Sequence, residues 1–378
     1  MTRLRSGFLI LSVTVSLLVA TVITAHLGRA LWSAIRADTS TLYDGLSEPA
    51  RGNYRHMSRA AVESLLSATW RPGWTYEPWT GFRERPRTSE FVNVDDAGLR
   101  SNHRQDHPLS RLEGAVWLLG GSTTFGYGVA DDETIPAQLE QLLGRPVVNF
   151  GRGYFYSAQE NLLLQRYLGA GHRPSEVWFL DGINERCELR VYEHAMSVLF
   201  NKAQDADRWD YLELVRPLSA LVTGIVGRRA ADADATRQAE ETRDLGPCTR
   251  FGRSTSLTVV VANQLLERAA LCRAYGIRCR TFVQPFPAVH VPHRGPELAA
   301  WERRVLQTLY ERISVAFKEA DAEFVTNALA DESGHAFVDG VHYSARANRV
   351  IASVMAARVR AHAEPGQSGS GNAAHTRK

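Results

Sequence analysis

The sequence predicts an α/β domain with a mostly parallel sheet, because short apolar runs alternate with amphipathic helical segments along the chain. The size supports this class, since 378 residues with 44% hydrophobic and 22% charged side chains can build a substantial core. The same composition excludes a disordered, collagen-like or disulfide-dense small protein. The buried-strand candidates are residues 115–120, 146–150, 176–182, 279–286 and 322–327.

Amphipathic helices are expected between and after these strands, because their apolar residues recur at helical spacing. Strands that alternate with helices in this way indicate βαβ units, whose parallel strands end at one common edge of the sheet. The predicted helices are residues 135–144, 157–170, 256–276, 297–320 and a final helix that follows Ser344.

The N-terminal segment predicts a membrane anchor. Residues 7–25 contain no charge, and an apolar run of about 19 residues can just span a bilayer as a helix. We expect residues 7–27 to form the anchor, with residues 1–6 in the cytoplasm and the rest of the chain on the other side. A cleaved signal peptide is the alternative, because Ala25 can precede a cleavage site, although the apolar run is long for one.

The remaining chain divides by composition into four parts. Residues 28–75 are expected to form a helical stalk, and residues 76–111 a small β region, because they combine Pro and Gly with short apolar alternations. The main α/β domain is expected over residues 112–363, with a polar insertion at about residues 186–255. Residues 364–378 are rich in Gly and Ser and are predicted to be disordered.

The charge balance argues against nucleic acid as a partner. The chain has 44 basic and 41 acidic residues, which gives a formal net charge of +3. The basic residues are spread over the chain and form no basic stripe of the kind that binds phosphates.

The four cysteines permit two disulfides, and their even number is compatible with an oxidising compartment. Cys272 lies near the end of a predicted helix and Cys279 begins the next strand, so their side chains can meet across the turn at Gly276. This pairing leaves Cys187 and Cys248 to bridge the insertion. Four buried thiols are the alternative.

Candidate catalytic residues follow the predicted strands, at the edge where open α/β sheets place their sites. Ser122 follows Gly120 and Gly121 after the first strand, where a tight turn can expose its hydroxyl. A phosphate cradle or a helix N-cap is the alternative, although the segment lacks the lysine of a Walker A loop. Gly153, with Gly151 as the fallback, can offer a backbone N–H to the cleft, or the two glycines serve only a turn.

Two later segments complete the set. Asn184 can donate a side-chain N–H to an oxyanion, although an asparagine after Gly182 and Ile183 also suits an ordinary turn. Asp339 and His342 are three residues apart, so a turn lets the carboxylate hold the imidazole while the other ring nitrogen faces the serine. Two metal ligands or a helix cap would also explain this pair. Together, in this order and at strand ends, the segments predict a serine hydrolase.

These segments resemble the sequence blocks of the SGNH hydrolases, the GDSL-like esterase and deacetylase superfamily, over roughly residues 112–360. The resemblance implies a flavodoxin-like three-layer α/β/α sandwich. It implies a triad and two oxyanion donors, with no metal and no other cofactor. The triad residues would be Ser122, Asp339 and His342, and the oxyanion donors Gly153 and Asn184.

Two positions depart from the pattern of the resembled family. Gly121 stands where an aspartate usually precedes the nucleophile, and Glu185 stands where an aspartate often follows the asparagine of the third block. Neither change removes a catalytic group. They indicate a divergent subgroup that resembles membrane-anchored proteins of the bacterial envelope.

The sequence therefore predicts a serine esterase or O-deacylase, anchored in the inner (cytoplasmic) membrane with its catalytic domain in the periplasm or cell exterior. The expected partners are an acylated carbohydrate or lipid as substrate, the membrane through residues 7–27, and envelope-assembly proteins. Two alternatives to this function remain open. One is an O-acyltransferase, in which a sugar hydroxyl intercepts the acyl-enzyme, and the other is an inactive binding or scaffold protein of an envelope assembly.

Overall fold

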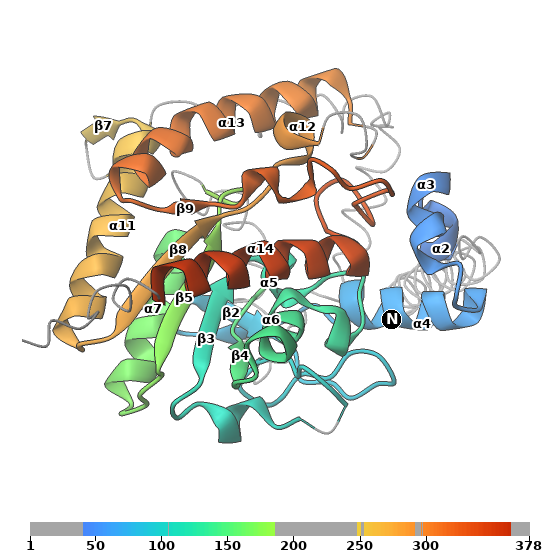
Figure 1. The fold of residues 1–378 in the computed structure, drawn as a ribbon, viewed down its shortest axis with the longest axis horizontal. Helices are drawn as coiled ribbons and strands as arrows, with labels where there is room; N and C mark the ends of the chain where they lie inside the picture. The colour runs from blue at the N-terminus through green and yellow to red at the C-terminus, as the bar shows by residue number, and fades with distance from the viewer. Residues whose placement is uncertain are drawn as a thin grey trace, which may run out of the picture. The chain divides into compact units, whose positions relative to one another are not determined.

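The structure is a computed structural model that describes residues 41–104, 106–185, 248–250, 253–291, 296 and 298–363 (Figure 1). The chain divides into two units, residues 1–45 and 46–378. In the first unit, the short helix α2 (Leu42–Gly45) is described. The other described elements belong to the second unit.

A parallel sheet of five strands forms the centre of the described part of the second unit, in the spatial order β4, β3, β5, β8 and β9. The strands are β3 (Val116–Gly120), β4 (Val147–Asn149), β5 (Glu176–Asp181), β8 (Arg278–Val283) and β9 (Glu323–Phe324). Each of the predicted strands is confirmed. β9 is shorter than the predicted 322–327, because the chain turns at Thr326 into the 3₁₀ helix η5 (Thr326–Leu329).

The long helices coincide with the predicted ones. They are α6 (Ile135–Leu143), α7 (Ser157–Gly169), α11 (Leu257–Ala274), α13 (Ala300–Glu319) and α14 (Ala345–Ala363). Shorter elements connect them: α5 (Ser122–Phe125), α12 (Pro287–His290) and the 3₁₀ helices η2 (Pro108–Arg111) and η3 (Asp131–Glu133). Local sequence explains the ends of α6, since the Thr134 hydroxyl accepts the Ala137 N–H at 3.3 Å and Gly144 ends the helix with φ 64°.

Helices cover both faces of the sheet, because alternate residues of each strand point to opposite faces. Val116 and Leu118 of β3 belong to a core with residues of α6 and α14, whereas Trp117 and Leu119 pack with residues of α7. α11 packs on α7 and on α13, and α14 crosses the strands in the layer that contains α6 (Figure 1). The fold is therefore the three-layer α/β/α sandwich that the sequence resemblance implies.

The predicted small β region contains an antiparallel hairpin. β1 (Trp74–Glu77) pairs with β2 (Gly81–Glu84). Isolated bridges then lead from the hairpin to the sheet, since Arg87 pairs with Val94, Val94 with Arg100, and Arg100 with Asn149 at the end of β4. The hairpin region is thus joined to the edge of the parallel sheet.

Residues 46–75 differ from the expected stalk, because they are part of the same unit as the sheet. This segment contains α3 (Glu48–Arg51), the 3₁₀ helix η1 (Gly52–Tyr54) and α4 (Arg59–Trp70). The Tyr54 hydroxyl donates to the Gly128 carbonyl oxygen at 2.7 Å, and the Asn53 amide donates to the Phe337 carbonyl oxygen at 2.9 Å. The apolar residues that suggested a stalk helix, such as Leu65, are buried instead.

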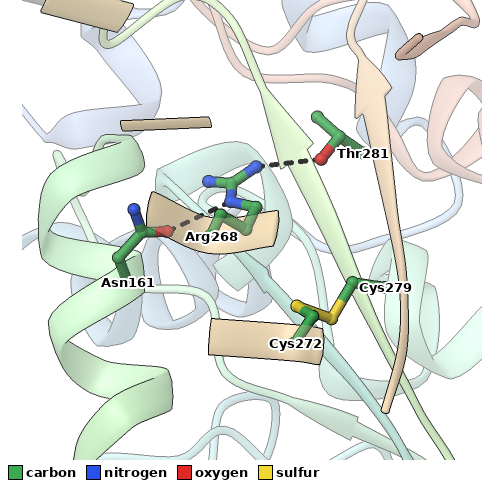
Figure 2. Close-up of a disulfide and its surroundings, with 5 residues drawn as sticks. All are labelled: Asn161, Arg268, Cys272, Cys279 and Thr281. Atoms are coloured by element: carbon green, nitrogen blue, oxygen red, sulfur yellow. Dashed lines mark hydrogen bonds between the residues drawn. A yellow bond between two sulfur atoms is a disulfide. The ribbon is translucent and has the colours of Figure 1, made fainter. Parts of the chain in front are cut away.

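A disulfide joins Cys272 at the end of α11 to Cys279 in β8, which confirms the predicted pairing across this corner (Figure 2). Cys248 is also in a disulfide, and its predicted partner Cys187 lies outside the described residues. Cys248 begins β6 (Cys248–Arg250), which pairs antiparallel with β7 (Arg253–Thr255).

Several predictions fall outside the described residues. They concern residues 1–6, the anchor at 7–27, most of the insertion at 186–255 and the tail at 364–378. In the part of the chain that the structure does describe, no helix combines the length and the apolar character needed to cross a membrane.

Candidate active site

The strand order creates a switch point between β3 and β5, at which the predicted residues Ser122 and Asn184 lie. After β3 the chain forms β4 on one side of it and then β5 on the other. Open α/β sheets bind ligands at the carboxyl ends of strands beside such a point. Ser122 is the first residue of α5, directly after β3, and Asn184 follows the end of β5.

Gly121 lets the Asn184 side chain lie directly against the backbone that precedes Ser122. A Cβ atom at position 121 would be 2.2 Å from Asn184 Nδ2, which is much closer than any normal contact. The same Nδ2 donates to the Phe155 carbonyl oxygen at 2.9 Å, so the amide is held in this place. A glycine before Ser122 is therefore required by the position of the Asn184 side chain.

Asp339 and His342 form a hydrogen-bonded pair in a tight turn. Asp339 Oδ2 is 2.6 Å from His342 Nδ1, and Oδ1 accepts the N–H groups of Val341 at 2.9 Å and His342 at 2.8 Å. A bridge between Phe337 and Tyr343 closes this turn. Burial by itself raises the pKa of Asp339, but the imidazole and the two N–H groups outweigh it and hold the pKa below its usual value.

Aromatic rings enclose the imidazole of His342. The Tyr127 ring stacks on it with centroids 5.2 Å apart, and the Trp70 ring meets it edge-on at 6.2 Å. His342 Nε2 is buried and has no hydrogen-bond partner within the described part of the chain. The backbone N–H of Tyr127 donates to the Ser122 carbonyl oxygen at 3.2 Å, so Ser122 and His342 contact the same residue.

A second connection between the serine and the histidine runs through Gln284, just beyond β8. The hydroxyl of Thr123, which follows Ser122, donates to Gln284 Oε1 at 2.7 Å. The hydroxyl of Tyr343, which follows His342, lies 3.5 Å from the same oxygen. The fold thus brings the nucleophile candidate and the base candidate to one place, although 220 residues separate them in the sequence.

The N–H of Gly153 already has a protein acceptor. It donates to Glu84 Oε1 at 2.9 Å, and the Tyr127 hydroxyl donates to the same oxygen at 3.0 Å. A Cβ atom at position 153 would be 2.6 Å from the Tyr127 hydroxyl, so only glycine fits here. The fallback residue Gly151 donates its N–H to Asn149 Oδ1 at 2.9 Å. This arrangement differs from the expectation of an N–H that faces an open cleft.

A buried charged cluster continues from the loop that carries Asn184. Arg268 Nη1 donates to Asp181 Oδ2 at 2.5 Å, and Nη2 donates to Glu160 Oε2 at 3.2 Å. Glu185, also buried, accepts the Ser157 hydroxyl at 2.8 Å. Burial, and then the neighbouring Asp181, raise the pKa of Glu185 to about 8, and burial raises the pKa of Glu160 as well.

Arg268 is held by residues of α7 and β8 (Figure 2), and it also lies over the ring of Phe179. Its Nε donates to Asn161 Oδ1 and its Nη1 to Thr281 Oγ1, both at 3.1 Å. The guanidinium carbon lies 3.6 Å from the centre of the Phe179 ring. Arg268 precedes the disulfide residue Cys272 by one helical turn, so the disulfide fixes the part of α11 that supplies this cation.

Sequence reasoning missed four residues of this region: Trp70, Glu84, Tyr127 and Gln284. Gln284 carried a usable signal, because it is a polar residue directly after an apolar strand, at the edge where sites lie. Trp70 lies in the segment that was predicted to be a stalk, so no role in the site was expected of it. Tyr127 lies in a segment whose only predicted site residue was Ser122. Glu84 gave no local signal, because its partner Gly153 is 69 residues away.

Comparison with known proteins gives structural similarity only. No protein-family model matches the sequence, and no curated protein matches it. The chain is similar to the solved structure of a carbohydrate acetylesterase family member from Sinorhizobium meliloti, with 14% identity and a TM-score of 0.36 over 65% of this chain and 98% of that chain.

Two further solved structures are similar to this chain. One is a lipase/acylhydrolase from Enterococcus faecalis, with 10% identity and a TM-score of 0.36 over 67% of this chain and 100% of that chain. The other is a GDSL-like lipase from Bacteroides thetaiotaomicron, with 13% identity and a TM-score of 0.34 over 66% of this chain and 89% of that chain. At such identities and TM-scores the similarity assigns no activity to this chain, so a function has to follow from its own site residues.

Proposed function

We propose that the protein is a serine hydrolase that cleaves ester bonds. The observation that carries this proposal is the state of His342. Its Nδ1 is bonded to Asp339 at 2.6 Å, while its Nε2 is buried and lacks a partner among the described residues. Ser122 contacts Tyr127, whose ring stacks on this imidazole. A carboxylate, an imidazole and a serine hydroxyl are the parts of a serine triad, and we propose Ser122 as the source of the hydroxyl.

In the proposed reaction, Ser122 Oγ attacks the carbonyl carbon of the ester while its proton passes to His342 Nε2. Asp339 keeps the other proton on Nδ1 and stabilises the imidazolium that forms. The imidazolium then protonates the leaving alcohol oxygen as its bond to the carbonyl carbon breaks, which leaves an acyl ester on Ser122. Water, which gives a proton to His342, attacks this ester and releases the acid, and the proton on His342 returns to Ser122 Oγ.

Asn184 is the proposed side-chain donor to the oxyanion, together with the N–H groups of Ser122 and Gly153. Asn184 uses one proton of Nδ2 on the Phe155 carbonyl and has a second one to offer. The Gly153 N–H donates to Glu84 Oε1 at 2.9 Å, so this hydrogen bond has to break before the N–H can donate to the oxyanion. We therefore assign the larger share of oxyanion stabilisation to Asn184.

We also propose that residues 7–27 anchor the protein in the inner membrane and that its catalytic domain faces the periplasm or cell exterior. The uncharged N-terminal run and the Cys272–Cys279 disulfide support this location, since disulfides persist mainly in oxidising compartments. The proposed substrates are O-acyl groups of an envelope polysaccharide or lipid.

The test uses the full-length chain purified in detergent, with 4-nitrophenyl acetate as substrate and a fluorophosphonate as an active-site probe. We expect hydrolysis of the ester and a single added probe mass, both of which Ser122→Ala abolishes. Ser110→Ala, which removes an exposed hydroxyl in η2, is the matched control and keeps both. Activity or labelling that survives Ser122→Ala contradicts the proposal. Formation of an acyl sugar instead of the acid, when an acceptor sugar is added, would identify an O-acyltransferase.

A further inference from the structure

Tyr154 lies at the rim of the candidate site, in the loop between β4 and α7. The residue before it, Gly153, donates its N–H to Glu84, and the carbonyl oxygen of the residue after it, Phe155, accepts the Asn184 amide. Tyr154 is therefore flanked on both sides by peptide groups that contact residues of the site. Its side chain is 41% exposed, in a loop whose other aromatic residues are buried.

The backbone of Tyr154 has a conformation that tyrosine rarely adopts. Its φ is +66°, in the left-handed region, which costs a non-glycine residue about 1 kcal/mol. Residues in such conformations cluster at catalytic sites and ligand clamps. A glycine would avoid this cost. A large exposed ring in a strained backbone conformation therefore indicates that the ring itself has a function.

Rings from the β1–β2 hairpin support Tyr154 from the side of the core. Trp74 of β1 meets the Tyr154 ring edge-on, with centroids 5.4 Å apart. Trp74 in turn packs on Phe82 of β2 at 5.2 Å, and Phe82 packs edge-on against Phe155 at 5.4 Å. Aromatic pairs in such arrangements are favourable, so the exposed ring is held in place.

The distribution of exposed apolar side chains indicates what such a ring would bind. Among the described residues, the exposed leucine and valine side chains lie on η2, α7, α11 and α13: Leu109, Leu162, Val259, Leu266 and Val315. None of them belongs to the loop that carries Tyr154. A long acyl chain needs an aliphatic surface next to the nucleophile, whereas a sugar ring can lay its C–H face on a single aromatic ring while its hydroxyls stay in water.

We propose that Tyr154, supported by Trp74, forms a subsite for the sugar ring that carries the ester. This inference rests on the proposed esterase function and specifies its substrate as an acylated carbohydrate. The subsite holds the alcohol part of the ester, outside the triad and the oxyanion donors. It therefore affects the binding of esters that contain a sugar ring and leaves small esters unaffected.

The experiment compares the full-length protein with Tyr154→Ala, Tyr154→Phe and a control, Val315→Ala, which removes an apolar side chain of similar exposure (46%) on α13. The substrates are an O-acetylated oligosaccharide, 4-nitrophenyl acetate and 4-nitrophenyl octanoate. We expect Tyr154→Ala to raise KM for the oligosaccharide about tenfold with an unchanged kcat, the scale of one lost aromatic contact. Kinetics on both nitrophenyl esters should stay the same, and Tyr154→Phe and Val315→Ala should match the wild type.

Three outcomes would overturn the subsite. They are an unchanged KM for the oligosaccharide, an equal loss on all three substrates, and a selective loss on the octanoate, which would place an acyl chain on the ring. Binding without turnover separates this inference from the proposed function. Titration of the Ser122→Ala protein with the oligosaccharide, followed by tryptophan fluorescence, should show binding that the added Tyr154→Ala change weakens, whether or not the wild type hydrolyses esters.

Discussion

Two clusters of polar side chains differ in how the charge of their carboxylates is balanced by neighbouring groups. In the first, Asp339 faces one imidazole and accepts two backbone N–H groups, and the pKa of its carboxyl is lowered. In the second, Asp181, Glu160 and Glu185 lie around Arg268, and the pKa of both glutamates is raised.

The comparison shows that burial alone does not decide the charge of a carboxyl group. Burial raises the pKa in both regions. At Asp339 the imidazole and two N–H groups overcome this effect, whereas the neighbouring Asp181 adds to it at Glu160 and Glu185. His342 Nε2 is buried without a partner among the residues that the structure describes, whereas every side-chain nitrogen of Arg268 donates to a neighbour. We therefore expect the first region to carry the chemistry and the second to hold the fold.

Removal of the proposed nucleophile Ser122 or the proposed base His342 should give the largest effect on activity and should spare stability. Ser122→Ala and His342→Ala should each lower kcat/KM for ester hydrolysis by about 10⁴-fold or more. Their unfolding midpoints in urea should stay close to that of the wild type. If a variant of Arg268 lost as much activity while keeping its stability, the assignment of catalysis to the first region and of stability to the second would be wrong.

Loss of the cation in the second region should act on stability. Arg268→Met should lower the free energy of unfolding by about 3–5 kcal/mol, because it leaves buried carboxylates without their cation. Urea denaturation measures this, with Arg273→Met, an exposed arginine near the end of the same helix, as the control. A loss below about 1 kcal/mol would mean that the cluster contributes little to the fold.

Asn184 directly precedes Glu185 of the second region, and its side chain lies against the backbone that precedes Ser122. Asn184→Ala should lower kcat by about 10²–10³-fold with little change in KM, the scale for one oxyanion donor. Asn327→Ala, at an exposed asparagine in η5, is the control. An unchanged kcat would remove Asn184 from the proposed oxyanion site.

Removal of the disulfide tests whether the corner between α11 and β8 contributes, like the Arg268 cluster, to the stability of the fold and not to activity. Replacement of both Cys272 and Cys279 by alanine opens a loop with a sequence separation of 7 and should cost about 2 kcal/mol of unfolding free energy. The kcat should not change. A large fall in kcat at unchanged stability would show that this corner acts on the catalytic region.

The pH dependence of stability tests the protonation of Glu185 in the second region. The pKa of Glu185 is about 8 in the folded state, above the ordinary value of 4.5, so the folded chain binds more protons between these pH values. Stability from this group is therefore fully present below pH 4.5 and falls as the pH rises towards 8, by at most about 1.4 kcal/mol per pH unit. Glu185→Gln should flatten this slope in urea unfolding between pH 5 and 8, whereas Glu319→Gln, at the exposed end of α13, should not. A slope that persists in Glu185→Gln would assign the proton elsewhere in the cluster.

Local patterns in the sequence determined the sheet, the long helices, the positions of Ser122 and Asn184 shortly after strands, and the turn that pairs Asp339 with His342. These features follow from hydrophobic periodicity and from polar residues directly after apolar strands, which a short window of sequence contains. The Cys272–Cys279 pair is also a local feature, because its sequence separation is only 7 and it spans one predicted helix–strand turn.

Only the tertiary structure decided which residues surround these positions. Gly153 donates to a glutamate 69 residues away, Arg268 binds an aspartate 87 residues away, and Trp70 of the expected stalk packs against His342. The clash that makes Gly121 necessary likewise comes from Asn184, on a different strand end. Such contacts depend on the order in which strands assemble and on the space left between them, and no local period of the sequence encodes either.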